Sequence, residues 1–352
     1  MSFLADRQGC GYLRIVFPHM LMNALKKDGF QFEADHTAKF INDTGYYKQY
    51  TLASFQRSAT GRQLELIMHF KTNIRKITKT PIVYESDDDF FNIPPWNYAS
   101  AYYTKNAENI KNILQITDGM TVSTEALKEL YSPYCNKIVV IPNSLPKFLW
   151  GDILQHEPNT VRPRILYAGS ENHFLNKHSS EYKNGMKAGG DFGDALIDFI
   201  RKTTDKYQWV FSGAYPLELE DLINEGKIER HPWQHILQYP KHVKSLNIDI
   251  WIAPLMKCDF NNSKSNIKAL EATATGCPCI FSNATPYKDF MLTSDTENEI
   301  IGHIEQLAHD ADLRKEVYDH DYNLVKEQLF WEENDNVLKY IRSHLNLFNK
   351  TI

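Results

Sequence analysis

One stretch, residues 260–282 (FNNSKSNIKALEATATGCPCIFS), gathers the side chains best suited to binding an anion. Its pattern predicts a loop, a helix and then a strand, with Ser263 and Ser265 as candidate N-cap residues. The start of a helix carries unpaired backbone N–H groups and the positive end of a dipole. Because Lys264 lies at this start, we expect Lys264, Ser265 and Asn266 to hold an anion such as a diphosphate.

A carboxylate follows on the same predicted helix. Glu271 lies six residues after Ser265 and is expected to face the same cleft, and Gly276 ends the helix. An ordinary surface helix with a polar first turn would show the same local pattern. However, the preceding run at 248–255 (IDIWIAPL) is typical of a buried strand, and open α/β sheets bind ligands at the carboxyl ends of their strands. This position favours a binding site.

The elements that must position these side chains follow an α/β pattern. Apolar strand-like runs alternate with helical periodicity along most of the chain, which predicts parallel sheets covered by helices. A polar stretch at 151–163 is typical of an interdomain linker. We therefore expect one domain over residues 1–155, a second over 156–330, and a helix in 331–352 that packs back toward the first domain.

Composition excludes several classes of protein. The chain has 352 residues, of which 42% are hydrophobic and 24% charged, which is typical of a soluble globular protein. No apolar run approaches the roughly 20 residues that span a bilayer, and no signal peptide is expected. Five scattered cysteines predict neither disulfides nor a metal site. We expect a cytoplasmic protein; the oligomeric state stays open.

A second group of candidate residues follows another predicted strand. The segment at 84–97 (YESDDDFFNIPPWN) contains three successive carboxylates, Asp87, Asp88 and Asp89, which need hydrogen bonds, cations or a bound proton to be stable together. One of them could orient or deprotonate a hydroxyl group. Alternatively, Asp87 or Asp89 caps the following turn and the others are solvated.

The first half of the chain is basic and the rest is acidic. Residues 1–150 carry a net charge of +3 against −8 for the remainder. The run at 57–79 contains six basic residues and the single acid Glu65. A cationic patch for phosphate groups is one interpretation of this run, and a solvated helix face is the commoner one.

Four motifs together resemble GT-B glycosyltransferases of the retaining, family-four type. They are Gly9-Cys10-Gly11 after the first strand, IPNS at 141–144, GSENH at 169–173, and the stretch at 260–282. The segment at 84–97 further resembles glycosyltransferases carried by tailed phages, which modify DNA. This resemblance implies an α/β fold of two Rossmann-like domains, a cleft between them and a clasping C-terminal helix.

The resemblance implies roles for individual residues. The donor nucleotide would be bound by Gly9, Cys10, Gly11, Gly169, Ser170, Ser265, Asn266 and Glu271. Glu271 would bind the ribose hydroxyls. The residues at the reacting centre would be Asp88, Asp89, Lys264 and His173. The chain departs from the family pattern at Ser263 and Ser170, where many members have a glutamate and an arginine.

The implied activity is transfer of a hexose, or a pentose such as arabinose, from a UDP-sugar to a hydroxyl group with retention. Neither a metal nor another cofactor is expected. The implied acceptor is 5-hydroxymethylcytosine in double-stranded phage DNA, with a saccharide acceptor or a non-catalytic binding module as alternatives. The candidate DNA-binding residues are Arg57, Arg62, Lys71, Arg75, Lys76 and Trp96.

Overall fold

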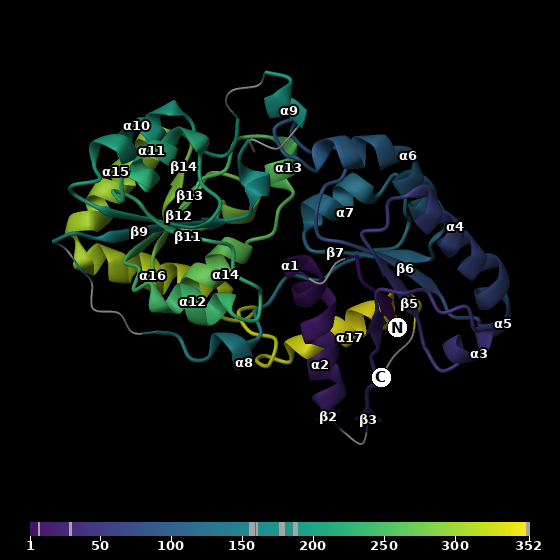
Figure 1. The fold of residues 1–352 in the computed structure, drawn as a ribbon. Helices are drawn as coiled ribbons and strands as arrows, with labels where there is room; N and C mark the ends of the chain where they lie inside the picture. The colour runs from purple at the N-terminus through teal and green to yellow at the C-terminus, as the bar shows by residue number, and fades with distance from the viewer. Residues whose placement is uncertain are drawn as a thin grey trace.

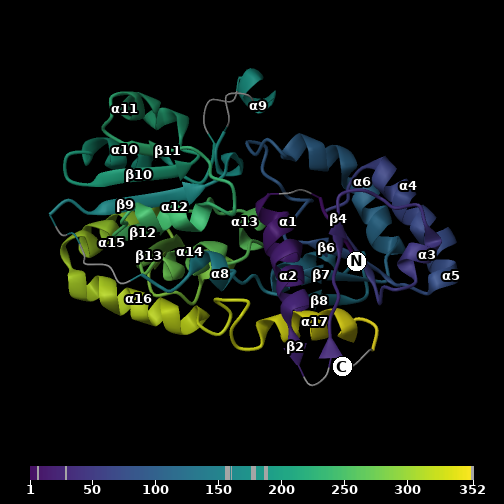
Figure 2. The same cartoon turned by 60° about the horizontal axis from the view of Figure 1, so that its bottom comes forward.

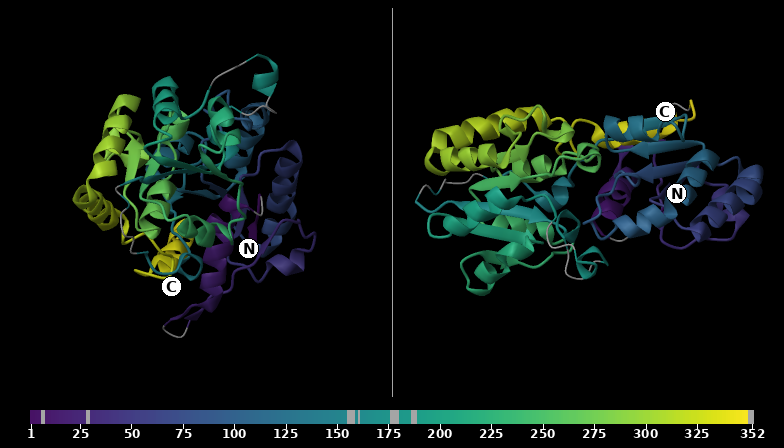
Figure 3. Two further views of the ribbon diagram at one scale, coloured as in Figure 1. Left: turned by 60° about the vertical axis from the view of Figure 1, so that its left-hand side comes forward. Right: turned by 90° about the horizontal axis from the view of Figure 1, so that it is seen from above.

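The computed structural model describes residues 1–5, 8–27, 30–154, 159, 161–175, 180–185 and 189–349. These residues form two lobes, each built on a parallel six-stranded sheet (Figure 1). The domain boundary expected at 155/156 lies outside the described residues. Seen from above, the lobes lie side by side (Figure 3).

The sheet of the first lobe has the strand order β4-β1-β5-β6-β7-β8. Its strands are β1 (Ser2–Phe3), β4 (His36–Thr37), β5 (Ala53–Gln56), β6 (Ile82–Ser86), β7 (Gly119–Val122) and β8 (Ile138–Val140), and a small hairpin is formed by β2 (Lys26–Lys27) and β3 (Phe30–Gln31). The helical segments are α1 (Gly9–Gly11), η1 (Tyr12–Val16), α2 (Phe17–Ala24), α3 (Thr44–Tyr47), α4 (Gly61–His69), η2 (Phe70–Ile74), α5 (Arg75–Thr78), α6 (Ser100–Ile116), α7 (Glu125–Tyr131) and α8 (Lys147–Trp150).

The sheet of the second lobe has the strand order β11-β10-β9-β12-β13-β14. Its strands are β9 (Arg164–Gly169), β10 (Gln208–Gly213), β11 (Glu229–His231), β12 (Ile250–Ala253), β13 (Cys279–Ser282) and β14 (Thr293–Ser294). The helical segments are η3 (Glu171–His173), α9 (Ser180–Lys183), α10 (Asp194–Lys202), η4 (Leu217–Leu219), α11 (Glu220–Asn224), α12 (Tyr239–Ser245), α13 (Asp259–Asn262), α14 (Ile267–Ala274), η5 (Thr285–Tyr287), α15 (Glu297–His309) and α16 (Ala311–Val325).

The central strands are apolar on both sides because helices cover both faces of each sheet. In β9, Ile165 and Tyr167 belong to the core beneath α10 and α15, while Leu166 and Ala168 belong to the core beneath α12 and α14. Such strands are continuous hydrophobic runs in sequence, without the alternation of a half-exposed strand. This is why the apolar runs predicted the strands well.

The chain returns to the first lobe at its end. After α16, it crosses beneath the molecule to α17 (Asn336–Asn346), as Figure 2 shows. Val337, Leu338 and Ile341 pack there with Ile141 and with Leu21 of α2. The apolar face of α17 therefore fastens the end of the second lobe's chain to the first lobe.

The predicted fold class is confirmed, but one local prediction is wrong. Neither Ser263 nor Ser265 is the N-cap of α14; that residue is Asn266, and its side chain makes no capping hydrogen bond. The short helix α13 ends at Asn262, and Ser263 is its C-cap. Ser263 therefore cannot also be the N-cap of α14. Within the described part of the chain, no helix combines the length and apolar character that crossing a membrane requires.

Candidate functional site

The two sheets each have a topological switch point, where the strand order reverses. In the second lobe it lies between β9 and β12, and in the first lobe between β1 and β5. Ligands of open α/β sheets bind outside the carboxyl ends of the strands at such points. A cavity of about 280 Å³ lies between the lobes and is lined from both. Its lining includes Gly9, Cys10, Asp87, Asp88, Asn143, Gly169, Ser170, His173, Lys264, Ser265 and Glu271.

The start of α14 supplies the cationic side of this cavity. The Lys264 ammonium lies 4.5 Å from the centre of the Phe260 ring, a cation–π contact that holds it at the cavity. The Ser265 hydroxyl accepts a hydrogen bond of 2.8 Å from Nδ2 of Asn143, which belongs to the first lobe. A helix start without a side-chain cap, next to a lysine, suits a phosphate group.

Glu271 projects into the same cavity from the second turn of α14. Its Oε2 accepts hydrogen bonds from the Tyr239 hydroxyl at 3.2 Å and from the Lys268 ammonium at 3.0 Å. The residue is 7% exposed, so the carboxylate is held in one orientation by its partners. A fixed carboxylate can accept two hydrogen bonds from adjacent hydroxyl groups of a ligand.

His173 is oriented by a buried carboxylate. Its Nδ1 lies 2.6 Å from Oδ2 of Asp191, whose Oδ1 accepts hydrogen bonds from the Met256 backbone N–H and from Nδ2 of Asn261. Because a carboxylate accepts, Nδ1 carries the proton in this arrangement. Burial and then the Lys264 charge lower the pKa of His173, and Asp191 offsets this only in part. His173 is therefore mainly neutral at pH 7 in the unliganded site.

The floor of the cavity between β9 and β10 is bare backbone. Gly213 has φ +94°, and a Cβ there would lie 2.2 Å from the carbonyl oxygen of Gly169. A Cβ on Gly169 would lie 2.5 Å from the hydroxyl of Tyr167, which is buried without a hydrogen-bond partner. Both glycines are thus required by the close packing of the strand ends, since a Cβ at either position would collide with Gly169 or with Tyr167.

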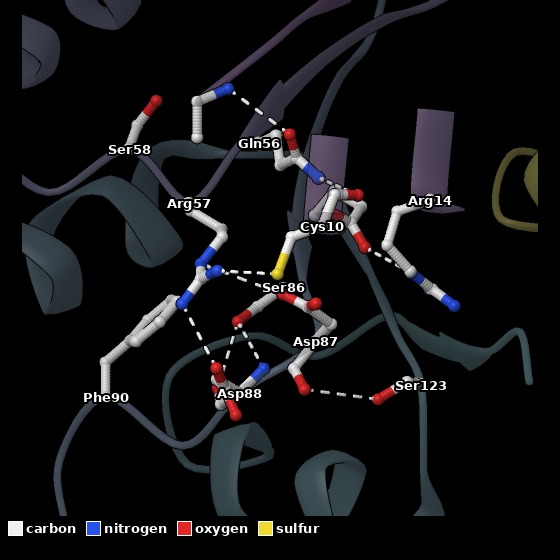
Figure 4. A network of polar contacts seen from close by, with 12 residues as sticks. Cys10, Arg14, Gln56, Arg57, Ser58, Ser86, Asp87, Asp88, Phe90 and Ser123 are labelled. Carbon is white, nitrogen blue, oxygen red and sulfur yellow. Dashed lines mark hydrogen bonds and ion pairs between the residues drawn. The ribbon is translucent and has the colours of Figure 1, made fainter. Parts of the chain in front are cut away.

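The opposite side of the cavity is anionic because Asp87 and Asp88 line it. Arg57 contacts both carboxylates (Figure 4). The Arg57 guanidinium donates to Oδ2 of Asp88 at 3.1 Å and to Sγ of Cys10 at 2.9 Å, and its Nε lies 3.7 Å from Oδ1 of Asp87. It also stacks over the Phe90 ring, with its central carbon 5.2 Å from the ring centre. The positive charge of Arg57 offsets much of the repulsion expected between the neighbouring carboxylates Asp87 and Asp88.

The two carboxylates in this network differ in their ionisation. Burial disfavours the charged form of Asp87, but Arg57 and Cys10 hold the pKa of its carboxyl below the ordinary value. Burial raises the pKa of Asp88; Asp87 and Asp89 add to the rise, and Lys264 and Arg57 oppose it. Pairs of carboxyl groups with separated pKa values are typical of sites that move or orient protons.

Asp89, predicted as a second candidate at the reacting centre, lies apart from the cavity lining. It is 1% exposed, and Oδ1 accepts hydrogen bonds from the backbone N–H groups of Phe91 and Asn92. Oδ2 accepts from the Asn92 side chain. This is the turn-capping arrangement that the sequence left as the alternative.

The basic run does not gather at the cavity. Arg57 is turned inward, whereas Arg75 pairs with Asp118 at 2.5 Å, at the amino-terminal edge of the sheet and so on the far side from the cleft. Arg62 lies on α4, Lys71 on η2 and Lys76 on α5. Trp96 is not among the residues that line the interlobe cavity. It lies against Gly189, where an added Cβ would come within 2.9 Å of the Trp96 Cβ.

Sequence reasoning missed a chain of polar contacts that joins the lobes. Nε of Arg14 donates to Glu85 at 2.7 Å, and Nη1 donates to Oδ1 of Asn143 at 3.0 Å. Asn143 in turn donates to Ser265. The motif IPNS at 141–144 pointed to Asn143, but Arg14 lies in a largely apolar helix and nothing local indicated its partners.

Neither a protein-family model nor a curated protein matches this sequence. Solved structures do match. A variant of TarM from S. aureus aligns with a TM-score of 0.55 and 13% identity over 87% of this chain and 58% of TarM, and a second TarM structure aligns with a TM-score of 0.56, 12% identity and similar coverage. The chain therefore spans less than three fifths of TarM.

A glycosyltransferase from Rickettsia africae ESF-5 aligns over a larger share of both chains. It aligns with a TM-score of 0.55 and 13% identity over 92% of this chain and 86% of its own. The TarM variant was crystallised with Fondaparinux, alpha-GlcNAc-glycerol and UDP. At these identities the likeness establishes the fold: the chain has the two-lobed α/β architecture of GT-B glycosyltransferase structures.

Proposed function

We propose that this protein is a glycosyltransferase that uses a nucleotide-sugar, most simply a UDP-sugar. One observation carries the proposal: a single interlobe cavity joins a cationic helix start and the Glu271 carboxylate on one side with Asp87 and Asp88 on the other. The fold is one that known glycosyltransferases share, and a TarM complex holds UDP. Fold alone does not imply function, so the proposal depends on the cavity.

The donor would lie along the second lobe. The start of α14 with Lys264 would bind the diphosphate, and His173, once protonated, would add a second positive charge. Glu271, already fixed by Tyr239 and Lys268, would accept hydrogen bonds from the ribose hydroxyls. Fixed donors and cations at a departing diphosphate stabilise the charge that develops there.

The acceptor would enter from the first lobe. Its hydroxyl oxygen forms a bond to the anomeric carbon while the bond from that carbon to the diphosphate oxygen breaks. The electron pair leaves with the nucleoside diphosphate, whose oxygen takes up the proton of the hydroxyl. Asp88 lies on this side of the cavity and would accept the hydrogen bond of the attacking hydroxyl. We propose that the reaction retains the configuration of the donor sugar, as the family resemblance implies.

For the acceptor, we keep 5-hydroxymethylcytosine in double-stranded DNA as the proposal. Its support is the phage-like segment at 84–97 and the exposed aromatic side chains Tyr98 and Tyr102 that follow it. Arg62, Lys71 and Lys76 extend along the first lobe, where phosphate contacts would make binding strongly salt-dependent. A saccharide is the second candidate, favoured by the presence of a glycoside in the TarM complex.

One experiment tests the activity and the acceptor together. The full chain is incubated with a panel of UDP-hexoses and UDP-pentoses and either hydroxymethylcytosine duplex DNA, unmodified duplex DNA or simple alkyl glycosides, and the products are weighed by mass spectrometry. We expect a mass increase of one sugar on the hydroxymethylated nucleoside only. Transfer of the sugar to an alkyl glycoside would mean that the acceptor is a saccharide and that DNA is not. UDP binding without turnover on any acceptor would contradict the enzymatic proposal.

A matched pair of variants tests the site. Glu271→Ala is expected to abolish turnover, while Glu299→Ala, which removes a carboxylate from α15 outside the cavity lining, serves as the control. Equal turnover by Glu271→Ala and the native chain would remove Glu271 from the donor site.

A further inference from the structure

Arg57 adopts a backbone conformation that its side chain does not favour. It follows β5 directly, at the switch point of the first lobe, and has φ +46°, in the left-handed region. For a residue with a Cβ, this conformation is uncommon and costs free energy unless the surroundings hold it. The Arg57 side chain is 15% exposed, so the conformation turns a long cation inward instead of into solvent.

The contacts of the guanidinium explain what holds it. It spans Cys10 on the loop after β1 and Asp87 and Asp88 after β6, and it rests on the Phe90 ring. A planar guanidinium can serve several acceptors in fixed directions at once, which an ammonium cannot. The network in Figure 4 therefore ties together two loops that converge on the cavity.

We propose that Arg57 is a positioning residue, which holds Asp87 and Asp88 so that the Asp88 carboxylate, and neither neighbour, receives the hydrogen bond of the acceptor hydroxyl. This inference rests on the proposed transferase function and deepens it.

The geometry distinguishes the three carboxylates. Asp89 is outside the cavity lining and both of its oxygens are bonded within its own turn. Asp87 and Asp88 both line the cavity, but the Asp88 side chain is 26% exposed against 12% for Asp87. Asp88 and Lys264 line the same cavity from different lobes, and the Lys264 charge lowers the pKa of the Asp88 carboxyl.

Arg57 also sets the charge of the pair. Its guanidinium lowers the pKa of both carboxyl groups, whereas burial raises the pKa of each. Removing the cation would therefore raise the pH needed to ionise Asp88. The rate would then fall at low pH and recover as the pH rises, which simple loss of structure would not produce.

The test compares Arg57→Met and Arg57→Lys with the native chain, on whichever acceptor the native chain glycosylates. Arg201→Met is the matched control, because it breaks another arginine–aspartate pair, with Asp221, on the outside of the second lobe. We measure kcat from pH 5 to 9 and the UDP dissociation constant by calorimetry. For Arg57→Met we expect kcat at pH 6 to fall at least tenfold, the acid limb to move up by about one pH unit, and UDP affinity to be unchanged.

For Arg57→Lys we expect a lower kcat with a smaller shift of the acid limb, since the charge remains and the planar contacts are lost. An acid limb and kcat in Arg57→Met equal to those of Arg201→Met would overturn the inference, although transfer by the native chain would still support the proposed function. Absence of transfer by the native chain would instead remove the proposed function. If Arg57→Met fails to bind UDP, Asp87→Asn decides: it removes the Arg57–Asp87 ion pair, keeps the Arg57–Asp88 pair, and must lower kcat with UDP affinity retained.

Discussion

The two sides of the cavity are built from the same kind of sheet edge but carry opposite charge. On the second lobe, the edge presents bare glycine backbone, the start of α14, Lys264 and a histidine that can become a cation. On the first lobe, the edge presents Asp87 and Asp88, with a single arginine behind them. Parallel sheets thus provide similar positions, and the loops that follow the strands decide what each position binds.

This difference matches the needs of a transfer reaction. In the proposed reaction, a diphosphate that departs with negative charge would be stabilised by the cationic side, and an attacking hydroxyl would be oriented by a carboxylate on the anionic side. Asp88 and Lys264 line the same cavity, one from each lobe. If the sides have separate roles, substitutions on one should spare the function of the other.

The largest expected effect is on the anionic side. Asp88→Asn keeps the shape of the side chain but removes the negative charge of the carboxylate that would receive the hydrogen bond of the acceptor hydroxyl. The value of kcat is therefore expected to fall about 100-fold. Steady-state kinetics at saturating UDP-sugar measure it. A fall in donor affinity as large as the fall in kcat would contradict separate roles.

The next effect is on the cationic side. Lys264→Met removes a charge-assisted contact to the diphosphate and is expected to weaken UDP binding about 10- to 100-fold. Lys288→Met, an exposed lysine of the same lobe, is the control and should bind UDP normally. Calorimetric titration with UDP compares the three proteins, and native affinity in Lys264→Met would remove the lysine from the diphosphate site.

A smaller effect concerns the proton of His173. Burial and Lys264 lower its pKa below the ordinary value, so at pH 6.5 the free site is mainly neutral. A bound diphosphate would raise that pKa, and the protein would take up a fraction of a proton, most at a pH between the pKa values of the free and the bound histidine. Titrations of UDP in buffers of different ionisation enthalpy measure this uptake, which should be lost in His173→Gln and kept in His309→Gln. Equal uptake in both variants would mean that another group binds the proton.

The smallest effect sharpens the assignment within the acidic run. Asp89→Ala removes the acceptors for two backbone N–H groups and one side chain, so the free energy of unfolding should drop by about 1 to 3 kcal/mol. Asp88→Ala should cost less stability, because Asp88 is the more exposed. Urea denaturation distinguishes the two, and the reverse order would exchange the structural and functional roles.

The sequence predicted the fold better than the details of the site. Strands such as β9 and β12 were predictable because they are apolar on both faces, and the helix of Glu271 because its apolar residues repeat with helical spacing. The N-cap of α14 was predicted wrongly because α13 occupies the residues before it. Local signals describe an element, and here a neighbouring element changed its boundary.

Partners distant in sequence were beyond prediction. Arg57 looked like one charge of a basic run, but its left-handed backbone turns it toward Asp88, while Arg75 of the same run pairs at the other edge of the sheet. Asn143 and Asp191 were likewise missed as partners of Ser265 and His173, because such contacts depend on how two lobes and several loops meet. A single sequence carries no signal for these pairings.

A crystal structure of the UDP complex tests the central claim most directly. The account predicts the diphosphate against Lys264 and the start of α14, with the ribose hydroxyls within hydrogen-bond distance of Glu271 and with Asp88 facing open space beside the diphosphate. A nucleotide lying against Asp87 and Asp88, or bound outside the interlobe cavity, would contradict it.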